Sequence, residues 1–311
     1  MSPLSKRRRL LIGIGLAAFV LNGCGYFSQA RRETKKMARE IIATDKNFRK
    51  TVAIAPFRNQ TYYKRVDIDS VFQTRLIDIL ESACPKLLVF KPESKQYPAF
   101  MMDLPRKAGG KIDNLKVALN ARPYGLDGVV TGTVVDIGAY EDKRGIAWMR
   151  DTHYFVQIQI LVELFDTETG AKLLDEHFIR EVEVDETDHL LVKQGKQAPI
   201  PEIPETLERI AAELGEKICD ALSSQRWKSY IVSKEGDRFV ISSGQRSGLK
   251  PGTVLEVYPS TEMVSGIGEE RFFVPGMKHA EVEIVQAESD RSEAVLKSGG
   301  DVQVGCAVKV K

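Results

Sequence analysis

The sequence lacks the short motifs that mark common catalytic and cofactor-binding sites. It has no GxxxxGK[ST] phosphate loop, no strand-linked GxGxxG and no GxSxG nucleophile turn, and Gly266 and Gly268 form only an isolated turn candidate. Its four histidines show no HxH or HExxH spacing; they are His153, His177, His189 and His279. The acidic residues from Glu181 to Glu186 mostly occupy alternate positions, as residues on the solvent-facing side of a strand do. We therefore expect no enzyme, no metal and no cofactor.

Cysteine is also scarce, with Cys24, Cys84, Cys219 and Cys306 as its four positions. None has the CxxC spacing of a zinc site. Cys84 and Cys219 each lie near the end of a predicted helix, and a disulfide between them suits an oxidising compartment. The alternative is that these two and Cys306 are small buried apolar side chains.

Only one long hydrophobic run is present, the 12 residues Leu10–Leu21. As a helix it covers about 18 Å, well short of the ~30 Å hydrocarbon core, so a permanent transmembrane anchor is the weaker interpretation. The run follows Lys6–Arg9 and precedes Asn22, Gly23 and Cys24. A cationic start, a short apolar stretch and a small residue before the cut are the three parts of an export signal.

The four residues Leu21–Cys24 resemble the bacterial lipobox, which ends in a cysteine that is acylated and before which the chain is cut. The resemblance implies a signal peptide over 1–23, cleavage between Gly23 and Cys24, and a lipid on Cys24. Gly25 stands where an aspartate would favour retention at the inner membrane, so we expect an outer-membrane protein that faces the periplasm. The alternative is an ordinary secretory signal with a chance cysteine at its end.

Net charge excludes nucleic acid as the expected partner. Without residues 1–23 the 45 Lys and Arg fall to 41, against 43 Asp and Glu, so the basicity of the full chain belongs to the signal. Residues 28–50 keep eight basic and three acidic side chains. We interpret 24–50 as the lipidated cysteine and a solvated basic tether; contact with anionic head groups is the alternative.

The rest of the chain predicts two domains, at 51–225 and 226–311. In the first, strands are expected at 52–57, 87–90, 128–137, 154–165 and 171–184, and helices at 67–84, 112–121 and 204–223. In the second, short strands at regular spacing alternate with glycine turns, without a convincing helix. The predicted class is α+β: a three-layer-like α/β domain with a mixed sheet, followed by a small all-β barrel or sandwich.

Both domains resemble parts of known envelope proteins. The strand that leads into Phe57–Thr61, the helix after it, the strand at 126–134 and the turn Asp166–Gly170 resemble the periplasmic domain shared by CsgG, LpoB and the N-terminal part of TolB. The segments 240–244, 247–252, 254–258 and 304–310 are similar to the C-terminal β domain of FlgT. The FlgT N-terminal domain has no counterpart here.

The resemblances imply a non-catalytic binding or assembly module of a cell-envelope machine, with flagellar, secretion or peptidoglycan-synthesis components, or copies of itself, as partners. Two alternatives are a CsgG-like secretion channel and an LpoB-like activator of a peptidoglycan synthase. Residues 139–152 read as a short loop with six charges, which argues against a spanning hairpin. Trp148 and Met149 on this loop are the candidate partner contact.

Overall fold

The computed structural model describes residues 47–62, 68–94, 96–146, 148–196, 198–260 and 262–311. The described residues belong to one compact unit, Asn47–Lys311. They confirm the predicted α+β class, because a mixed sheet with helices is followed by a closed six-stranded barrel. Gly23 and Cys24 lie outside the described residues. No helix in the part of the chain that the structure describes is long and apolar enough to cross a membrane.

The mixed sheet has the strand order β3-β1-β4-β5-β6, and the short β2 pairs with β4. Its strands are β1 (Lys50–Ile54), β2 (Arg58–Asn59), β3 (Leu87–Phe90), β4 (Gly128–Ile146), β5 (Met149–Asp166) and β6 (Lys172–Val184). Strand β1 is parallel to both of its neighbours, β3 and β4, whereas β4, β5 and β6 form an antiparallel meander. Parallel neighbours need long crossover connections, and the chain supplies helices there.

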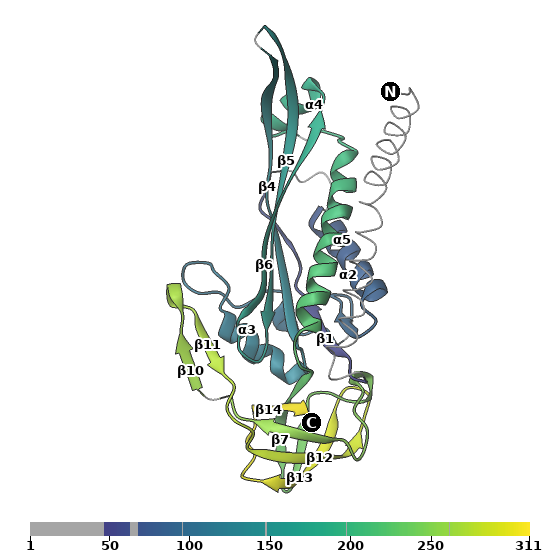
Figure 1. The fold of residues 1–311 in the computed structure, drawn as a ribbon, viewed down its shortest axis with the longest axis vertical. Coiled ribbons are helices and arrows are strands. Elements are labelled where there is room, and N and C mark those ends of the chain that lie inside the picture. Colours follow the sequence, from purple (N-terminus) through teal and green to yellow (C-terminus); the bar gives the residue numbers. More distant parts are fainter. Residues whose placement is uncertain (1–46, 63–67, 95, 147, 197, 261) are drawn as a thin grey trace, which may run out of the picture. The chain divides into compact units, whose positions relative to one another are not determined.

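Two helices, α2 (Ile68–Ala83) and α5 (Glu202–Ser223), cover one face of this sheet (Figure 1). Their inward positions recur at helical spacing and are buried; they are Phe72, Leu76 and Leu80 in α2 and Leu207, Ile210, Leu214 and Ile218 in α5. Full burial of each such side chain contributes about 1.5–3 kcal/mol. The helices approach closely at Gly215, where a Cβ atom would lie 2.5 Å from Cγ2 of Ile79.

The opposite face is covered over only part of its length, by α3 (Asn114–Ala121) and a small apolar cluster that includes Met101, Leu104, Val117 and Phe165. Asp113 caps α3 by accepting a hydrogen bond from the Lys116 N–H at 3.2 Å. Beyond α3, side chains of β4, β5 and β6 stay exposed on this face, Val135 and Ile179 among them.

The C-terminal barrel closes in the order β12-β13-β8-β7-β14-β9. Its strands are β7 (Lys228–Glu235), β8 (Arg238–Ile241), β9 (Val254–Tyr258), β12 (Ala280–Ala287), β13 (Ser292–Gly299) and β14 (Ala307–Val310). Alternate residues fill the interior, with Phe239, Leu255 and Val282 among those that are buried. A hairpin of β10 (Glu262–Ser265) and β11 (Arg271–Val274) is inserted between β9 and β12.

Residues 185–204 and 47–50 differ from the sequence prediction. No helix or strand is predicted between 184 and 204, but α4 (Glu186–Lys193) forms there, and Asp185 caps it by accepting a hydrogen bond from the Asp188 N–H at 2.8 Å. The predicted tether also extends too far. The Phe48 ring packs against Trp227 with the ring centroids 5.1 Å apart and the rings tilted by 41°, and the Trp227 indole donates to the Arg49 carbonyl at 3.2 Å, so residues 47–50 belong to the fold.

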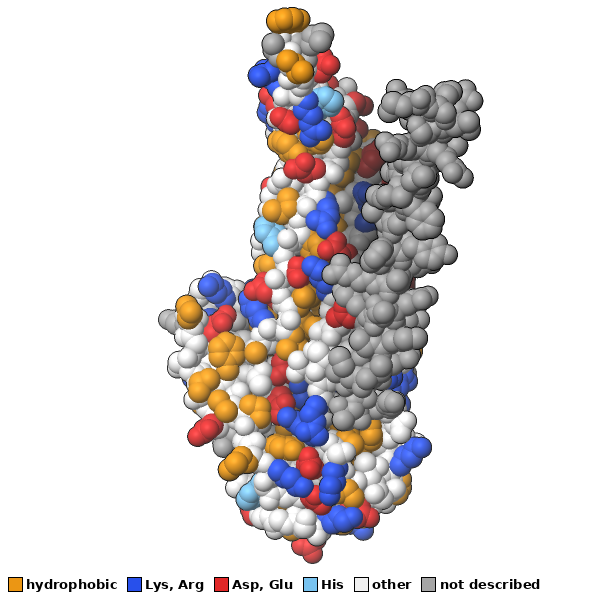
Figure 2. Space-filling model, in the orientation of Figure 1, with side chains coloured by type: hydrophobic (Ala, Val, Ile, Leu, Met, Phe, Trp, Pro, Cys, Tyr) orange, Lys and Arg blue, Asp and Glu red, His pale blue; other side chains and the backbone are white. Residues whose placement is uncertain are grey.

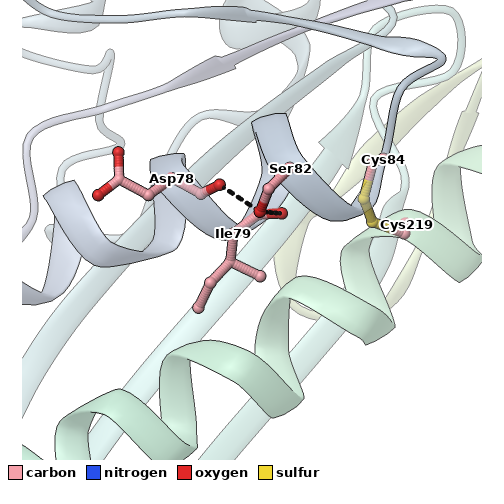
Figure 3. Close-up of a disulfide and its surroundings, with 5 residues drawn as sticks. All are labelled: Asp78, Ile79, Ser82, Cys84 and Cys219. Carbon is pink, nitrogen blue, oxygen red and sulfur yellow. Dashed lines mark hydrogen bonds between the residues drawn. A yellow bond between two sulfur atoms is a disulfide. The ribbon is translucent and has the colours of Figure 1, made fainter.

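A disulfide joins α2 to α5 at the end near the barrel (Figure 3). Cys84 directly follows α2 and Cys219 lies in the last part of α5, with their Cα atoms 6.2 Å apart and both side chains buried. In the preceding turn of α2, the Ser82 hydroxyl donates to the Asp78 carbonyl at 2.7 Å. Cys306 is buried in the barrel and is free.

Reduction of this disulfide should destabilise the protein strongly, because the bond closes a loop between residues 135 positions apart in the sequence. The chain-entropy model gives about 5 kcal/mol for a loop of that size, and we expect the unfolding free energy in urea to fall by about 3–5 kcal/mol on reduction. A Cys84→Ala/Cys219→Ala variant should respond little to the reductant. In a denatured but unreduced Cys24→Ser variant, thiol titration should find one thiol, that of Cys306; three thiols would contradict the pairing.

Candidate functional site

The segment read from the sequence as a charged loop, 139–152, is a β-ribbon in the structure. Strands β4 and β5 pair from Gly128 opposite Asp166 to Ile146 opposite Met149, with one bulge after Val134. The third strand, β6, ends at Val184 opposite Tyr154. We call the two-stranded remainder, from Glu141 to Tyr154, the arm. The prediction of a short loop is therefore wrong, and the six charges of the segment lie on a β-ribbon.

Polar and aromatic contacts along the ribbon explain why a charged sequence forms strands here. Tyr140 and Phe155 stack across the strands with ring centroids 5.2 Å apart, and the Arg144 guanidinium lies 4.7 Å from the Phe155 centroid. Arg144 also pairs with Asp142 at 3.0 Å, and His153 contacts Glu183 of β6 at 2.7 Å. Cross-strand pairs of this kind stabilise a ribbon whose two faces are both wet.

The end of the arm is apolar and exposed. Ile146 is 83% exposed and Trp148 is 91% exposed, and Figure 2 shows hydrophobic side chains at the end of the arm. Met149 begins β5, but its side chain lies outside what the structure describes. The sequence-predicted contact at Trp148 is thus placed at the far end of the ribbon, where a partner could reach it.

Helix α4 supports the ribbon where the arm begins. The His189 ring is buried and lies 4.8 Å from the Tyr154 ring, and neither of its nitrogens has a hydrogen-bond partner among the described residues. The Tyr62 hydroxyl donates to the Val192 carbonyl at 2.6 Å, which ties α4 to the loop after β2. The base of the arm is therefore packed, and the exposed end extends beyond that support.

The turn between β5 and β6, Asp166–Gly170, is held from several elements at once, and we call it the junction turn. Asp166 pairs with Lys228 of β7, and both side chains are buried. The second carboxylate oxygen of Asp166 accepts from the Thr169 N–H at 2.9 Å and from the Thr169 hydroxyl at 2.6 Å. Glu168 pairs with Lys309 of β14 at 2.7 Å. The barrel is thus fixed to the mixed sheet by buried polar contacts.

Arg122 holds the junction turn from its other side. The guanidinium donates to the carbonyls of Thr167 at 3.1 Å and Glu168 at 2.7 Å. It also lies 4.4 Å from the ring centroid of Phe273 in β11 and 5.3 Å from that of Tyr230 in β7. The Tyr230 hydroxyl shares a hydrogen bond of 2.8 Å with the Thr167 hydroxyl.

A second acid, Asp127, lies close to this network. It is 2% exposed, and its Oδ2 accepts from the Thr51 N–H of β1 at 2.7 Å. Burial raises the pKa of Asp127 to about 7, outweighing the lowering effects of Lys228 and the Thr51 N–H. For Asp166, burial also acts to raise the pKa, but Lys228 and the Thr169 hydrogen bonds hold it below the usual value. The pKa of Lys228 is raised because its acidic neighbours outweigh its burial.

Among the described residues no three His, Cys, Asp or Glu side chains are grouped as metal ligands. His153 and His177 lie on β5 and β6, His189 in α4 and His279 next to β12, so no two of them share an element. The contacts of Lys228 with the junction turn are not predictable from the sequence, because a lone lysine at the start of a strand carries no local signal.

Comparison with known proteins gives likenesses of structure only. No protein-family model matches the chain, and no curated protein sequence matches it. Among solved structures, a hypothetical protein from Chlamydia trachomatis is 17% identical, with a TM-score of 0.32, over 55% of this chain and 98% of that one. A lipoprotein from Neisseria meningitidis is 10% identical, with a TM-score of 0.30, over 54% of this chain and 99% of that one.

A longer match is to TolB from Acinetobacter baumannii, which is 12% identical with a TM-score of 0.27. It covers 82% of this chain and 62% of that one. The function therefore has to be inferred from the chain's own residues.

Asp127 should give folding stability a measurable pH dependence. Because its folded pKa is raised from 3.8 to about 7, the stability present below about pH 4 is lost as the pH rises through about 7. Residue 127 of an Asp127→Asn variant cannot ionise, so the variant should not lose this stability. The unfolding free energy of the variant minus that of the wild type should therefore increase by on the order of 4 kcal/mol from pH 4 to pH 8. Urea unfolding at several pH values measures this. An Asp151→Asn control in the arm should follow the wild type, and parallel profiles for Asp127→Asn and wild type would refute the assignment.

Proposed function

We propose that the protein is a lipoprotein of the bacterial cell envelope that is anchored to the outer membrane through Cys24 and binds a partner protein with the end of its arm. The observation that carries the proposal is the 91% exposure of Trp148 at the end of a two-stranded ribbon. A tryptophan side chain in that position leaves a large apolar surface in water, and tryptophan is among the side chains that contribute most when buried at an interface.

The anchor is supported by the N-terminal sequence. The basic start, the short apolar run and Leu21–Cys24 together fit a signal that ends in an acylated cysteine. An exported, lipid-anchored chain meets an oxidising compartment, which suits the buried disulfide between Cys84 and Cys219.

The arm suits recognition of a protein surface. Its apolar end is followed inward by Arg144 and Arg150 and by Asp142 and Asp151, so both signs of charge surround the apolar contact. Charges at the rim of an interface set the orientation and the on-rate, while a buried aromatic residue at its centre supplies most of the affinity. Candidate partners are flagellar, secretion or peptidoglycan-synthesis components, or a second copy of this chain.

A photocrosslinking amino acid at Ile146 should capture an envelope protein in living cells, and the same amino acid at Thr74 on α2 serves as the control. Adding Trp148→Ala to the Ile146 crosslinking chain should lower the yield at least fivefold, because the indole is the proposed anchor. The substitution should change the unfolding free energy by no more than about 0.5 kcal/mol from the wild-type value, because the exposed indole makes little buried contact within the chain. Equal capture from positions 146 and 74, or a yield that Trp148→Ala leaves unchanged, would overturn the proposed contact. Capture of the chain itself would identify the partner as a second copy.

Replacing Cys24 with serine should release the protein from the membrane fraction into the soluble periplasmic fraction and abolish incorporation of labelled fatty acid. A Cys306→Ser variant is the matched control, because Cys306 is buried in the barrel and should not affect anchoring. Unchanged fractionation of Cys24→Ser, with no fatty acid in the wild type, would contradict the lipid anchor.

A further inference from the structure

A cleft of about 480 Å³ opens on the partly covered face of the mixed sheet, away from the arm. Its floor is formed by Thr131 and Thr133 of β4 and Leu161 of β5. The loop from Arg106 to Ile112 and the first residue of α3 form one wall, and Glu270 and Phe272 at β11 form another. Figure 1 shows the hairpin of β10 and β11 beside α3, which is how an insertion in the barrel comes to border the sheet.

Asn114 lines this cleft and has one acceptor atom without a described partner. The residue is 96% buried, and its Nδ2 donates to the carbonyls of Gly170 at 2.9 Å and Arg271 at 2.7 Å. These two acceptors settle the orientation of the amide, because a flipped side chain would place its oxygen against both carbonyls. The Oδ1 atom is therefore an acceptor, and it is buried without a hydrogen-bond partner among the described residues. A buried polar atom in that condition favours a ligand that donates an N–H or O–H.

The same wall supplies positive charge. Arg106 is oriented by a hydrogen bond of 2.7 Å from its Nη1 to the Gly110 carbonyl, while its Nε is buried without a partner among the described residues. Neither Arg106 nor Lys111 has an ion pair with a described carboxylate, whereas Lys172 is paired with Glu163 at 2.6 Å and with Asp175 at 2.9 Å. Arg106 and Lys111 are thus two cations of the lining with no carboxylate partner, while the carboxylate of Glu270, which also has no ion pair with a described residue, lies on the other wall.

These groups define the chemistry of a ligand. The ligand should carry an N–H for Asn114 close to a carboxylate for Arg106 and Lys111, with small apolar groups against Leu161 and Phe272. The last residue of a polypeptide has an amide N–H and a carboxylate in that proximity. We propose that the cleft binds the carboxyl-terminal end of an extended peptide. This site is separate from the arm, and the inference does not depend on the arm contact.

The test uses the purified lipidated chain in detergent micelles, with N-acetyl-trialanine and its C-terminal amide as probes, and measures saturation transfer to the acetyl methyl group and the dissociation constants by titration. The free acid should bind at least tenfold more tightly than the amide. Arg106→Gln should remove this difference, and Lys111→Gln, which changes an exposed side chain, should reduce it. A Thr74→Ala variant, on the other face of the sheet, should bind as the wild type does.

Equal binding of acid and amide, or no saturation transfer from the wild type at 10 mM peptide, would overturn the proposal. So would an acid preference that neither Arg106→Gln nor Lys111→Gln reduces. Displacement of the acid by an uncharged disaccharide would overturn it in favour of a glycan site. Since these probes do not involve Trp148, Ile146 or Cys24, the outcome is independent of the proposed envelope function.

Discussion

The buried pair between Asp166 and Lys228 is the contact on which the arrangement of the two halves depends. It joins the end of β5 to the start of β7 where both side chains are almost inaccessible to water. Removing one member of such a pair typically costs about 3–5 kcal/mol, because the other is left charged and buried. Asp166 has a further partner, because the N–H and the hydroxyl of Thr169 both donate hydrogen bonds to its second carboxylate oxygen. The junction turn is therefore held in one conformation, and the barrel with it.

The same turn relates the barrel to the arm and the cleft. Strand β5 runs without a break from the end of the arm, at Met149, to the junction turn, at Asp166. Movement of the barrel against the sheet would have to break the contacts of Lys228, Arg122 and Lys309 with this turn. The structure accordingly favours a stiff body that presents an exposed arm at one end of β5 and a barrel at the other. Such a body suits a protein that positions partners by binding them.

The sequence predicted the elements whose signal is local. The helices α2 and α5 were found because Leu76, Leu80, Leu214 and similar residues recur at helical spacing, and the barrel strands because glycine turns separate short apolar runs. The arm was missed since both of its faces meet water, so its sequence has no apolar alternation. The four-residue strands β10 and β11 and the eight-residue α4 were too short for periodicity. The junction and the cleft could not be predicted at all, because Asp127 and Lys228, or Arg106 and Phe272, come together only through the folded topology.

In the cell, the end of the arm should be covered by a partner. Hydroxyl-radical footprinting with mass spectrometry measures it directly, by comparing side-chain oxidation in the purified protein with oxidation in intact cells. Trp148 should be oxidised rapidly in the purified protein and be protected severalfold in cells, while Met277, which is 89% exposed and outside the arm, should react equally in both. Equal oxidation of Trp148 in the two samples would contradict the claim.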